Sequence, residues 1–308
     1  MNRFQPLAFL FLIIMLMNCN QQSSSENLDF DFSKMTSKGA LLTTRFKSFE
    51  ELKKIIDIEY SSFINSSVTI TYSHEGQKIS STLKSGIKES DILKTRDGSF
   101  LDKVWLSLRS PYFVTHRNDL MRVYILSRRR HKIFGAGDVA FYDLAETMKN
   151  HIDEVNLVSI DSLDLTEKGF INTFNHINAQ AFMTSIFSED LADFIADTHE
   201  RTNLPELVTG DFTEEQLADI KNGPTDNYID IINNEWGQEL GKLLQKKYNI
   251  SRATIWTPEL LANYLNDMQS YYSGILEIGF RPFRVEDEIV VKFSKKINRV
   301  IEGVSGVR

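Results

Sequence analysis

The chain has 308 residues, of which 42% are hydrophobic and 25% are charged, and this composition excludes a collagen-like or disordered polypeptide. Its 35 Lys and Arg against 42 Asp and Glu give a net charge of −7. This acidic balance argues against a general nucleic-acid-binding protein, which needs clustered cations to neutralise phosphates. A single cysteine excludes an intrachain disulfide.

Residues 1–18 have the pattern of a secretory signal peptide. Met1-Asn2-Arg3 is a short positive start, and an unbroken apolar run follows from Leu7 to Met17. This run is too short to cross a bilayer, since a helix needs about 20 apolar residues to span the hydrocarbon core. We therefore expect the segment to direct secretion and to be removed.

The end of this segment, Leu16-Met17-Asn18-Cys19, resembles a bacterial lipobox. A lipobox usually has Gly, Ala or Ser before the cysteine, where this chain has Asn18. The resemblance implies that Cys19 is lipidated, with palmitate among its acyl chains, and becomes the mature N-terminus. The alternative is an ordinary secretory signal with an incidental cysteine.

Residues 19–44 are predicted to be the lipidated cysteine and a flexible tether, because residues 20–26 are polar and low in complexity. Acyl chains would attach the protein to a membrane, which is its expected partner. No aspartate follows Cys19, so the inner-membrane retention signal of many lipoproteins is missing. The resemblance to lipoproteins therefore favours the outer membrane or the cell surface of a bacterium.

Residues 45–137 are predicted to form a small α+β lobe. Apolar residues share one face of a helix over 48–58, and residues 68–83 alternate around a turn, as in a β-hairpin. Residues 86–134 mix short apolar runs with a basic run, Arg128-Arg129-Arg130-His131-Lys132. The basic run is interpreted as a solvated face or, alternatively, as a site for an anionic ligand or lipid headgroup.

Residues 138–308 are predicted to form a helical domain, which makes the chain mainly α. Helices are expected over 138–155, 166–187, 189–201, 213–221, 227–248 and 257–278, and a strand over 288–293. Two helix starts have clear capping residues: Thr213 with Gln216 as a capping box, and Thr257 as N-cap before Pro258.

Three of these helices carry polar residues on faces that an amphipathic helix would fill with apolar ones. The polar residues are Thr173, His176, Gln180 and Thr184 in the first helix, His199 and Glu200 in the second, and Asp230, Asn233 and Asn234 in the third. Gly237 and Gly241 extend the third stripe, and two glycines inside a helix indicate a close approach of a neighbour or ligand.

The order Phe174-Asn175-His176, then His199-Glu200, then Asp230 to Gly237 resembles an uncharacterised helical domain of secreted bacterial lipoproteins and polymorphic toxins. The resemblance covers residues 165–245. That family commonly has Arg where this chain has Asn175 and Gln238. The resemblance implies a helical domain and no particular activity.

The residue types allow metal binding or acid–base catalysis. Two imidazoles and a carboxylate suit a divalent metal such as zinc, and we expect His176, His199 and Asp230 as ligands. The candidate catalytic residues are His176, His199, Glu200 and Asp230, with Asn233, Asn234 and Gln180 as supporting partners. The chain is not a His-Glu-x-x-His metalloprotease, because Asn203 stands at the last position.

Two hypotheses on function stay open. The first is a membrane-anchored lipoprotein with a metal-dependent or histidine-based, hydrolase-like helical site. The second is a non-enzymatic binding or structural lipoprotein of the cell envelope, in which the same residues form a polar helix-packing network. A protein or small-molecule partner is unspecified in both, and convergence of the four side chains would favour the first.

Overall fold

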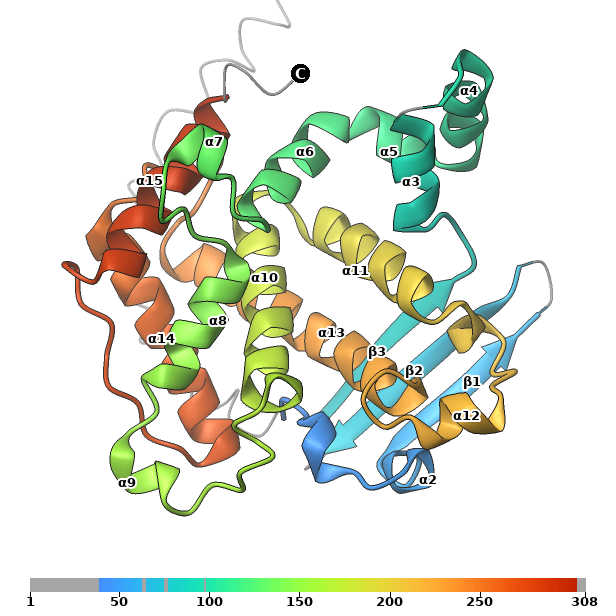
Figure 1. Cartoon of the computed structure of the whole chain (residues 1–308), viewed down its shortest axis with the longest axis horizontal. Coiled ribbons are helices and arrows are strands. Elements are labelled where there is room, and N and C mark those ends of the chain that lie inside the picture. The colour runs from blue at the N-terminus through green and yellow to red at the C-terminus, as the bar shows by residue number, and fades with distance from the viewer. Residues whose placement is uncertain (1–38, 63–64, 75–76, 97, 304–308) are drawn as a thin grey trace, which may run out of the picture. The chain divides into compact units, whose positions relative to one another are not determined.

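The computed structural model describes residues 39–62, 65–74, 77–96 and 98–303 (Figure 1). The expected signal peptide, Cys19 and most of the expected tether lie outside the described residues. The described part is mainly α-helical, with a small antiparallel sheet towards its N-terminal end, as the sequence predicts.

The strands are β1 (Ile56–Ser61), β2 (Ser67–His74) and β3 (Gln77–Lys84). The longer helices are α3 (Glu89–Arg96), α4 (Phe100–Arg109), α6 (Arg117–Leu126), α8 (Phe141–Asn150), α10 (Asn172–Ile186), α11 (Glu189–Asn203), α13 (Pro224–Lys247), α14 (Pro258–Leu276) and α15 (Glu288–Glu302). Shorter turns of helix are η2 (Thr43–Arg45), α2 (Phe49–Leu52), α5 (Pro111–Thr115), α7 (His131–Phe134), α9 (Glu154–Leu157), η3 (Glu167–Ile171), η4 (Pro205–Val208) and α12 (Glu214–Ala218).

The sheet has the order β1-β2-β3, and the predicted hairpin is its β2–β3 pair. The first strand differs from the prediction of a single helix over 48–58. Ser48 caps a helix of one turn only, and from Ile56 the chain pairs with β2, with Ile58 opposite Ile70. In β1 only Ile56 is buried and Ile58 is half-buried, so its alternating pattern is too short to separate from a helical one.

One face of the sheet packs against α13 and forms what we call the sheet core. Val68, Ile70 and Leu83 are buried there against Ile229 and Trp236 of α13. In Figure 1 the helix α13 lies across the sheet, and η4 contacts β2 and β3. The alternating apolar residues of β2 therefore lie on one face of the strand, and this face is buried in the sheet core.

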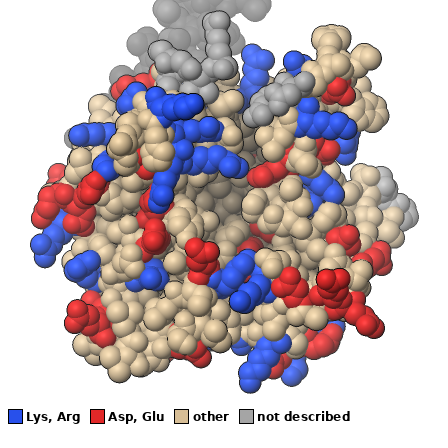
Figure 2. Space-filling view, in the orientation of Figure 1, with Lys and Arg blue, Asp and Glu red and all other residues tan. Residues whose placement is uncertain are grey.

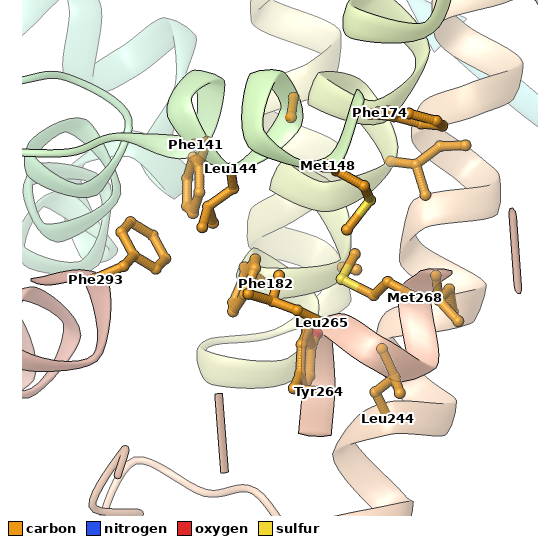
Figure 3. Close-up of a cluster of buried hydrophobic side chains, with 14 of the residues drawn as sticks. Phe141, Leu144, Met148, Phe174, Phe182, Leu244, Tyr264, Leu265, Met268 and Phe293 are labelled. Atoms are coloured by element: carbon orange, nitrogen blue, oxygen red, sulfur yellow. The ribbon is translucent and has the colours of Figure 1, made fainter. Parts of the chain in front are cut away.

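The larger cluster, which we call the helical core, lies among α8, α10, α14 and α15. Figure 3 shows Phe141 of α8, Phe182 of α10, Tyr264 of α14 and Phe293 of α15 facing one another. The rings of Phe182 and Tyr264 stack with centroids 4.7 Å apart, and Phe182 meets Phe293 edge-on at 5.5 Å. These aromatic pairs add to the apolar burial that holds the helices together.

Helix α13 belongs to both cores. Its N-terminal half carries Tyr228 to Trp236 into the sheet core, and its C-terminal half carries Leu240 and Leu244 into the helical core. Val123, Ile125 and Leu126 of the expected N-terminal lobe also lie in the helical core. The boundary expected between residues 137 and 138 therefore falls inside the packed structure, and the described residues form one compact unit.

Three further expectations differ from the structure. Residues 40–43 are buried rather than part of a free tether, and the backbone of Leu41 is held by the side chain of Asn233. Residues 89–134 are helical where a mixture of strands and helices was expected. Residues 288–293 begin α15 instead of forming a strand, because Val290, Phe293, Ile297 and Val300 continue one apolar helix face.

The predicted capping residues are found at both helix starts. Thr213 and Gln216 form the capping box of α12, and Thr257 caps α14 ahead of Pro258. Within the described ranges, no helix is both long enough and apolar enough to cross a membrane.

Candidate functional site

The candidate site lies where three helices meet. Helix α10 contributes His176, α11 contributes Glu200 and α13 contributes Asp230. The packing of α10 on α13 is the most extensive contact between any two helices of the described part. Figure 1 shows α10, α11 and α13 converging beside the sheet, so both cores support the site.

Two glycines of α13 bring its backbone close to α10. A Cβ atom on Gly237 would lie 2.6 Å from the Cβ atom of Gln180 and 2.7 Å from the carbonyl oxygen of Ile177. A Cβ atom on Gly241 would lie 2.7 Å from the carbonyl oxygen of Ala181. The close approach that the glycine stripe predicts is present, and it is an approach to helix backbone.

Three of the four expected site residues converge. His176, Glu200 and Asp230 each offer an atom that could bind a metal, and these three atoms lie within 4.8 Å of one another. His176 Nε2 and Asp230 Oδ2 are 3.4 Å apart. Two ligands of one tetrahedral zinc ion are separated by roughly 3.3–3.5 Å, given zinc–ligand distances near 2.0–2.2 Å. The His176–Asp230 separation therefore fits a shared ion.

Asparagine amides hold one atom of each of these three side chains. His176 Nδ1 is 2.9 Å from Asn234 Oδ1, and because an amide oxygen only accepts, Nδ1 carries the hydrogen. Asn234 Nδ2 donates to Glu200 Oε1 at 3.3 Å, and Asn172 Nδ2 donates to Asp230 Oδ1 at 2.8 Å. The atoms left over are His176 Nε2, Asp230 Oδ2 and Glu200 Oε2.

One of these remaining atoms has no hydrogen-bond partner. Glu200 Oε2 is buried, and nothing in the described part of the chain bonds to it. A buried polar atom without a partner costs roughly 1–3 kcal/mol on protein mutational scales, and native proteins keep few of them. An unpartnered carboxylate oxygen beside a histidine and a second carboxylate can coordinate a cation or accept a hydrogen bond from water.

Burial shifts the pKa of all three groups towards the neutral form. It lowers the pKa of His176 to about 4, although the bond to Asn234 acts in the other direction. It raises the pKa of Glu200 to about 8. It also raises the pKa of Asp230 well above its usual range, and the charges of Asp226 and Glu200 add to this rise. Without a cation, this site therefore resists ionisation at neutral pH.

His199 lies next to the cluster rather than in it. Its ring centroid is 6.4 Å from that of His176, and its Nδ1 is 3.4 Å from Glu89 Oε1 at the start of α3. The bond to Glu89 raises the pKa of His199, and the side chain of His199 is 44% exposed. The metal set expected from the sequence was His176, His199 and Asp230, whereas the structure places Glu200 beside His176 and Asp230.

The expected supporting residues divide into two groups. Asn234 bridges His176 and Glu200, as a supporting partner should. Asn233 instead bonds to the backbone of Leu41, and Gln180 accepts from Gln238 Nε2 at 3.3 Å. Asn233 and Gln180 thus form hydrogen bonds elsewhere in the fold and none with the three converging groups.

Several residues at the site were not found by sequence reasoning. Asn172 and Glu89 bond to Asp230 and His199, and Asp226, one turn before Asp230, pairs with Lys168 at 2.6 Å. The four-residue spacing of Asp226 and Asp230 is visible in the sequence and could have indicated a shared face. Glu89 gives no such indication, because it lies 110 residues from His199.

Two other features of the surface are separate from this site. A cavity of about 530 Å³ lies between α8 and the start of α15 and is lined by His151, Asp143 and Lys292 among others, so it does not include the converging residues. Glu189, Glu235 and Glu239 also cluster, but Lys242 pairs with Glu189 and Glu239 at 2.8 Å each. The face drawn in Figure 2 is hollowed near its centre, beside the helices that Figure 1 labels α10 and α11.

Comparison of the chain with models of known protein families, with curated proteins and with solved structures finds no match. The resemblance of the His176, His199-Glu200 and Asp230 to Gly237 segments to an uncharacterised helical domain therefore stays a prediction from those segments.

Proposed function

We propose that the protein is a membrane-anchored bacterial lipoprotein whose helical site binds a divalent metal such as zinc and performs hydrolase-like chemistry. The observation that carries the proposal is the convergence of His176, Glu200 and Asp230, each with one atom held by an amide. Protein metal sites use the same arrangement, in which a second partner on each ligand fixes its orientation and leaves one atom for the ion.

The donor set suits a catalytic rather than a purely structural ion. Structural zinc sites are usually closed by four Cys or His ligands, whereas catalytic sites have three protein ligands and one open position. One imidazole and two carboxylates make three ligands. An ion here would offset the cost of burying two carboxylates, and a divalent metal supplies Lewis-acid activation of water or of a carbonyl or phosphoryl oxygen.

His199 and Glu89 are suited to proton transfer beside such an ion. The pair is partly exposed to solvent, whereas His176 and Asp230 are nearly buried, at 13% and 7% side-chain exposure. Glu89 orients the His199 ring and favours its protonated form, since the bond between them raises the pKa of His199. A substrate arriving from solvent would thus meet an acid–base histidine before the buried ligands.

The anchored part of the proposal comes from the sequence. The short positive start, the apolar run and Leu16-Met17-Asn18-Cys19 support lipidation of Cys19, and the absence of aspartate after it supports the outer membrane or cell surface. A three-ligand site of this kind is compatible with ester, amide and phosphoester hydrolysis.

A polar packing network is the second candidate, and one observation favours it. Asn234 links His176 to Glu200 within the protein, so two of the three groups are already joined without an ion. In that case Asp230 and Glu200 would keep their protons, and the cluster would set the register of α10, α11 and α13.

Metal analysis of the purified protein decides between the two candidates. The full chain, purified without an affinity tag and dialysed against buffer with zinc, should hold one zinc ion per chain. His176→Ala and Glu200→Gln should each lose it, whereas His131→Ala, which removes an exposed histidine on α7, should keep it. Absence of stoichiometric zinc, manganese or iron from a correctly folded wild-type protein would leave the packing network as the function of these residues.

A further inference from the structure

Helix α4 carries an apolar face that the rest of the described chain leaves uncovered. Phe100, Leu101, Trp105 and Leu108 are 78%, 75%, 64% and 71% exposed, and Val104 between them is 39% exposed. Successive members of this set are one or three residues apart and three pairs are four apart, which places all five on one side of the helix. Exposed large apolar residues are common singly, but five on one helix face mark an interaction surface.

The helix projects from the body of the protein. Its main contacts are with α3 and α5, its neighbours in the chain, and Figure 1 shows it at the upper right, away from both cores. Ser99 and Asp102 form a capping box at its start, so its N-terminus is stabilised locally. The fold therefore presents a preformed helix to something outside this chain.

The segment that contains α4 has the opposite charge to the rest of the protein. Residues 88–132 include eleven Lys and Arg but only five Asp and Glu, within a chain whose net charge is −7. Lys103 and Arg109 lie on α4 itself and are exposed. In Figure 2 the tip at the upper right is largely uncharged, with Lys and Arg side chains beside it.

We propose that α4 docks on an anionic lipid surface, with its apolar face in the headgroup region and the exposed cations of segment 88–132 that are closest to it in sequence, Lys94, Lys103, Arg109 and Arg117, facing the phosphates. Helices that lie in a membrane interface have Trp, Phe and Leu on one face and Lys or Arg beside it. Anionic lipids attract such basic residues. The interaction does not depend on the metal site, and it would remain if Cys19 carried no lipid.

Charge argues against a second copy of the chain as the occupant. A symmetric dimer through α4 would place the same surface of both copies face to face, and therefore one cationic segment against another. A bilayer with anionic headgroups offers the complementary charge and an apolar layer at the same surface. If Cys19 is lipidated, the protein is already held at such a surface.

Trp105 provides a direct test, because the other two tryptophans are buried. Trp236 and Trp256 are 2% and 1% exposed, so changes in fluorescence on binding report mainly on Trp105. The full chain with Cys19→Ala, which cannot be acylated, is mixed with vesicles of phosphatidylcholine containing phosphatidylglycerol. We expect a blue shift and reduced quenching by acrylamide, both weaker with phosphatidylcholine alone and at high salt.

Variants separate α4 from other membrane-binding parts of the chain. Phe100→Ser with Leu108→Ser should weaken partition to the anionic vesicles on the order of tenfold or more, because two apolar side chains no longer enter the lipid. Ile255→Ser, which removes an exposed isoleucine outside the cationic segment, should leave partition unchanged. All these side chains are exposed, so the variants should fold.

Three results would overturn the proposal. The first is that the protein does not sediment with anionic vesicles at all. The second is that it sediments while Trp105 stays open to acrylamide, which would assign binding to the N-terminal segment. The third is a dimer, detected by sedimentation velocity without lipid, that shields Trp105. None of these results bears on lipidation of Cys19 or on the metal site.

Discussion

Glu200 is one of two buried carboxyl groups at the candidate site whose pKa is raised, the other being Asp230. The folded-state pKa of Glu200, about 8, lies above the ordinary value of 4.5, so the folded protein binds a proton that the unfolded chain releases. Stability from this group is fully present below pH 4.5 and is lost as the pH rises through 8. We expect the metal-free protein to unfold at lower urea concentration at pH 8.5 than at pH 6.

A matched substitution isolates this effect. Glu200→Gln keeps the shape and the acceptor for Asn234 but cannot ionise, so its urea midpoint in the presence of a chelator should fall less between pH 6 and pH 8.5. Zinc added to the wild type should stabilise it more at the higher pH, because the ion displaces the proton. A wild-type profile as flat as that of the variant would show that Glu200 is not held protonated.

At the level of single residues, the sequence identified His176, Glu200 and Asp230 because each interrupts an otherwise apolar helix face. It did not place His199 correctly, since the position of that side chain depends on Glu89, which arrives from α3. Asn172 was also missed, because an asparagine in the first turn of a helix is common for reasons of local hydrogen bonding alone. Partners that come from distant elements leave no pattern in one sequence.

At the level of elements, the contact between α10 and α13 should be intolerant of added volume. Gly237→Ala would place a Cβ atom 2.7 Å from the Ile177 carbonyl oxygen, which is helix backbone and cannot move aside. We expect a loss of about 1–3 kcal/mol in the free energy of unfolding, typical of overpacking. Gly274→Ala, at an exposed glycine inside α14, is the control for the gain in helix propensity, and equal urea midpoints for the two variants would contradict the close approach.

The N-terminal end of the described chain is attached to α13 by two side chains of that helix, because Asp226 accepts a hydrogen bond from Thr43 and Asn233 bonds to the backbone of Leu41. Asn233 accepts from the Leu41 amide and donates to its carbonyl oxygen, both at 2.9 Å. Asn233→Ala leaves the buried Leu41 amide without that partner and should cost about 1–3 kcal/mol of unfolding free energy. Asn203→Ala, at the exposed end of α11, should cost much less. The measurement is urea unfolding, and an unchanged midpoint for Asn233→Ala would show that its two hydrogen bonds to Leu41 contribute little stability.

Helices with a capping residue and a long apolar stripe were predictable, and α10, α11, α13 and α14 lie close to the expected ranges. The failures occurred where a short apolar run could be either helix or strand. Glu288 to Phe293 is such a run, and only its continuation to Val300 identifies α15. The strand β1 was not predicted for a related reason, because pairing with β2 outweighs the helical pattern after Leu52.

At the level of the whole molecule, the position of the site is set by α13, which contributes residues to both the sheet core and the helical core. The prediction of two parts divided near residue 137 correctly placed the sheet in the first part and a helical domain in the second. It missed the shared helix, because a long helix that serves two cores has the same apolar pattern as one that serves a single core. Asp230 and Asn234 lie in the half of α13 that faces the sheet core, and Gly237 and Gly241 mark its contact with α10.

Attachment to a membrane is then expected to have two components of different strength. Acyl chains on Cys19 would contribute about 0.8 kcal/mol for each buried CH₂ group, whereas α4 and the cationic segment would give reversible, salt-sensitive binding. We expect mass spectrometry of the mature protein to detect acylated Cys19. Cys19→Ala should move most of the protein from the membrane fraction into a high-salt wash, because only the weaker component remains. If the Cys19→Ala protein stayed membrane-bound through that wash after its N-terminal segment had been removed, something other than an acyl chain would be holding it. That result would contradict the lipid anchor.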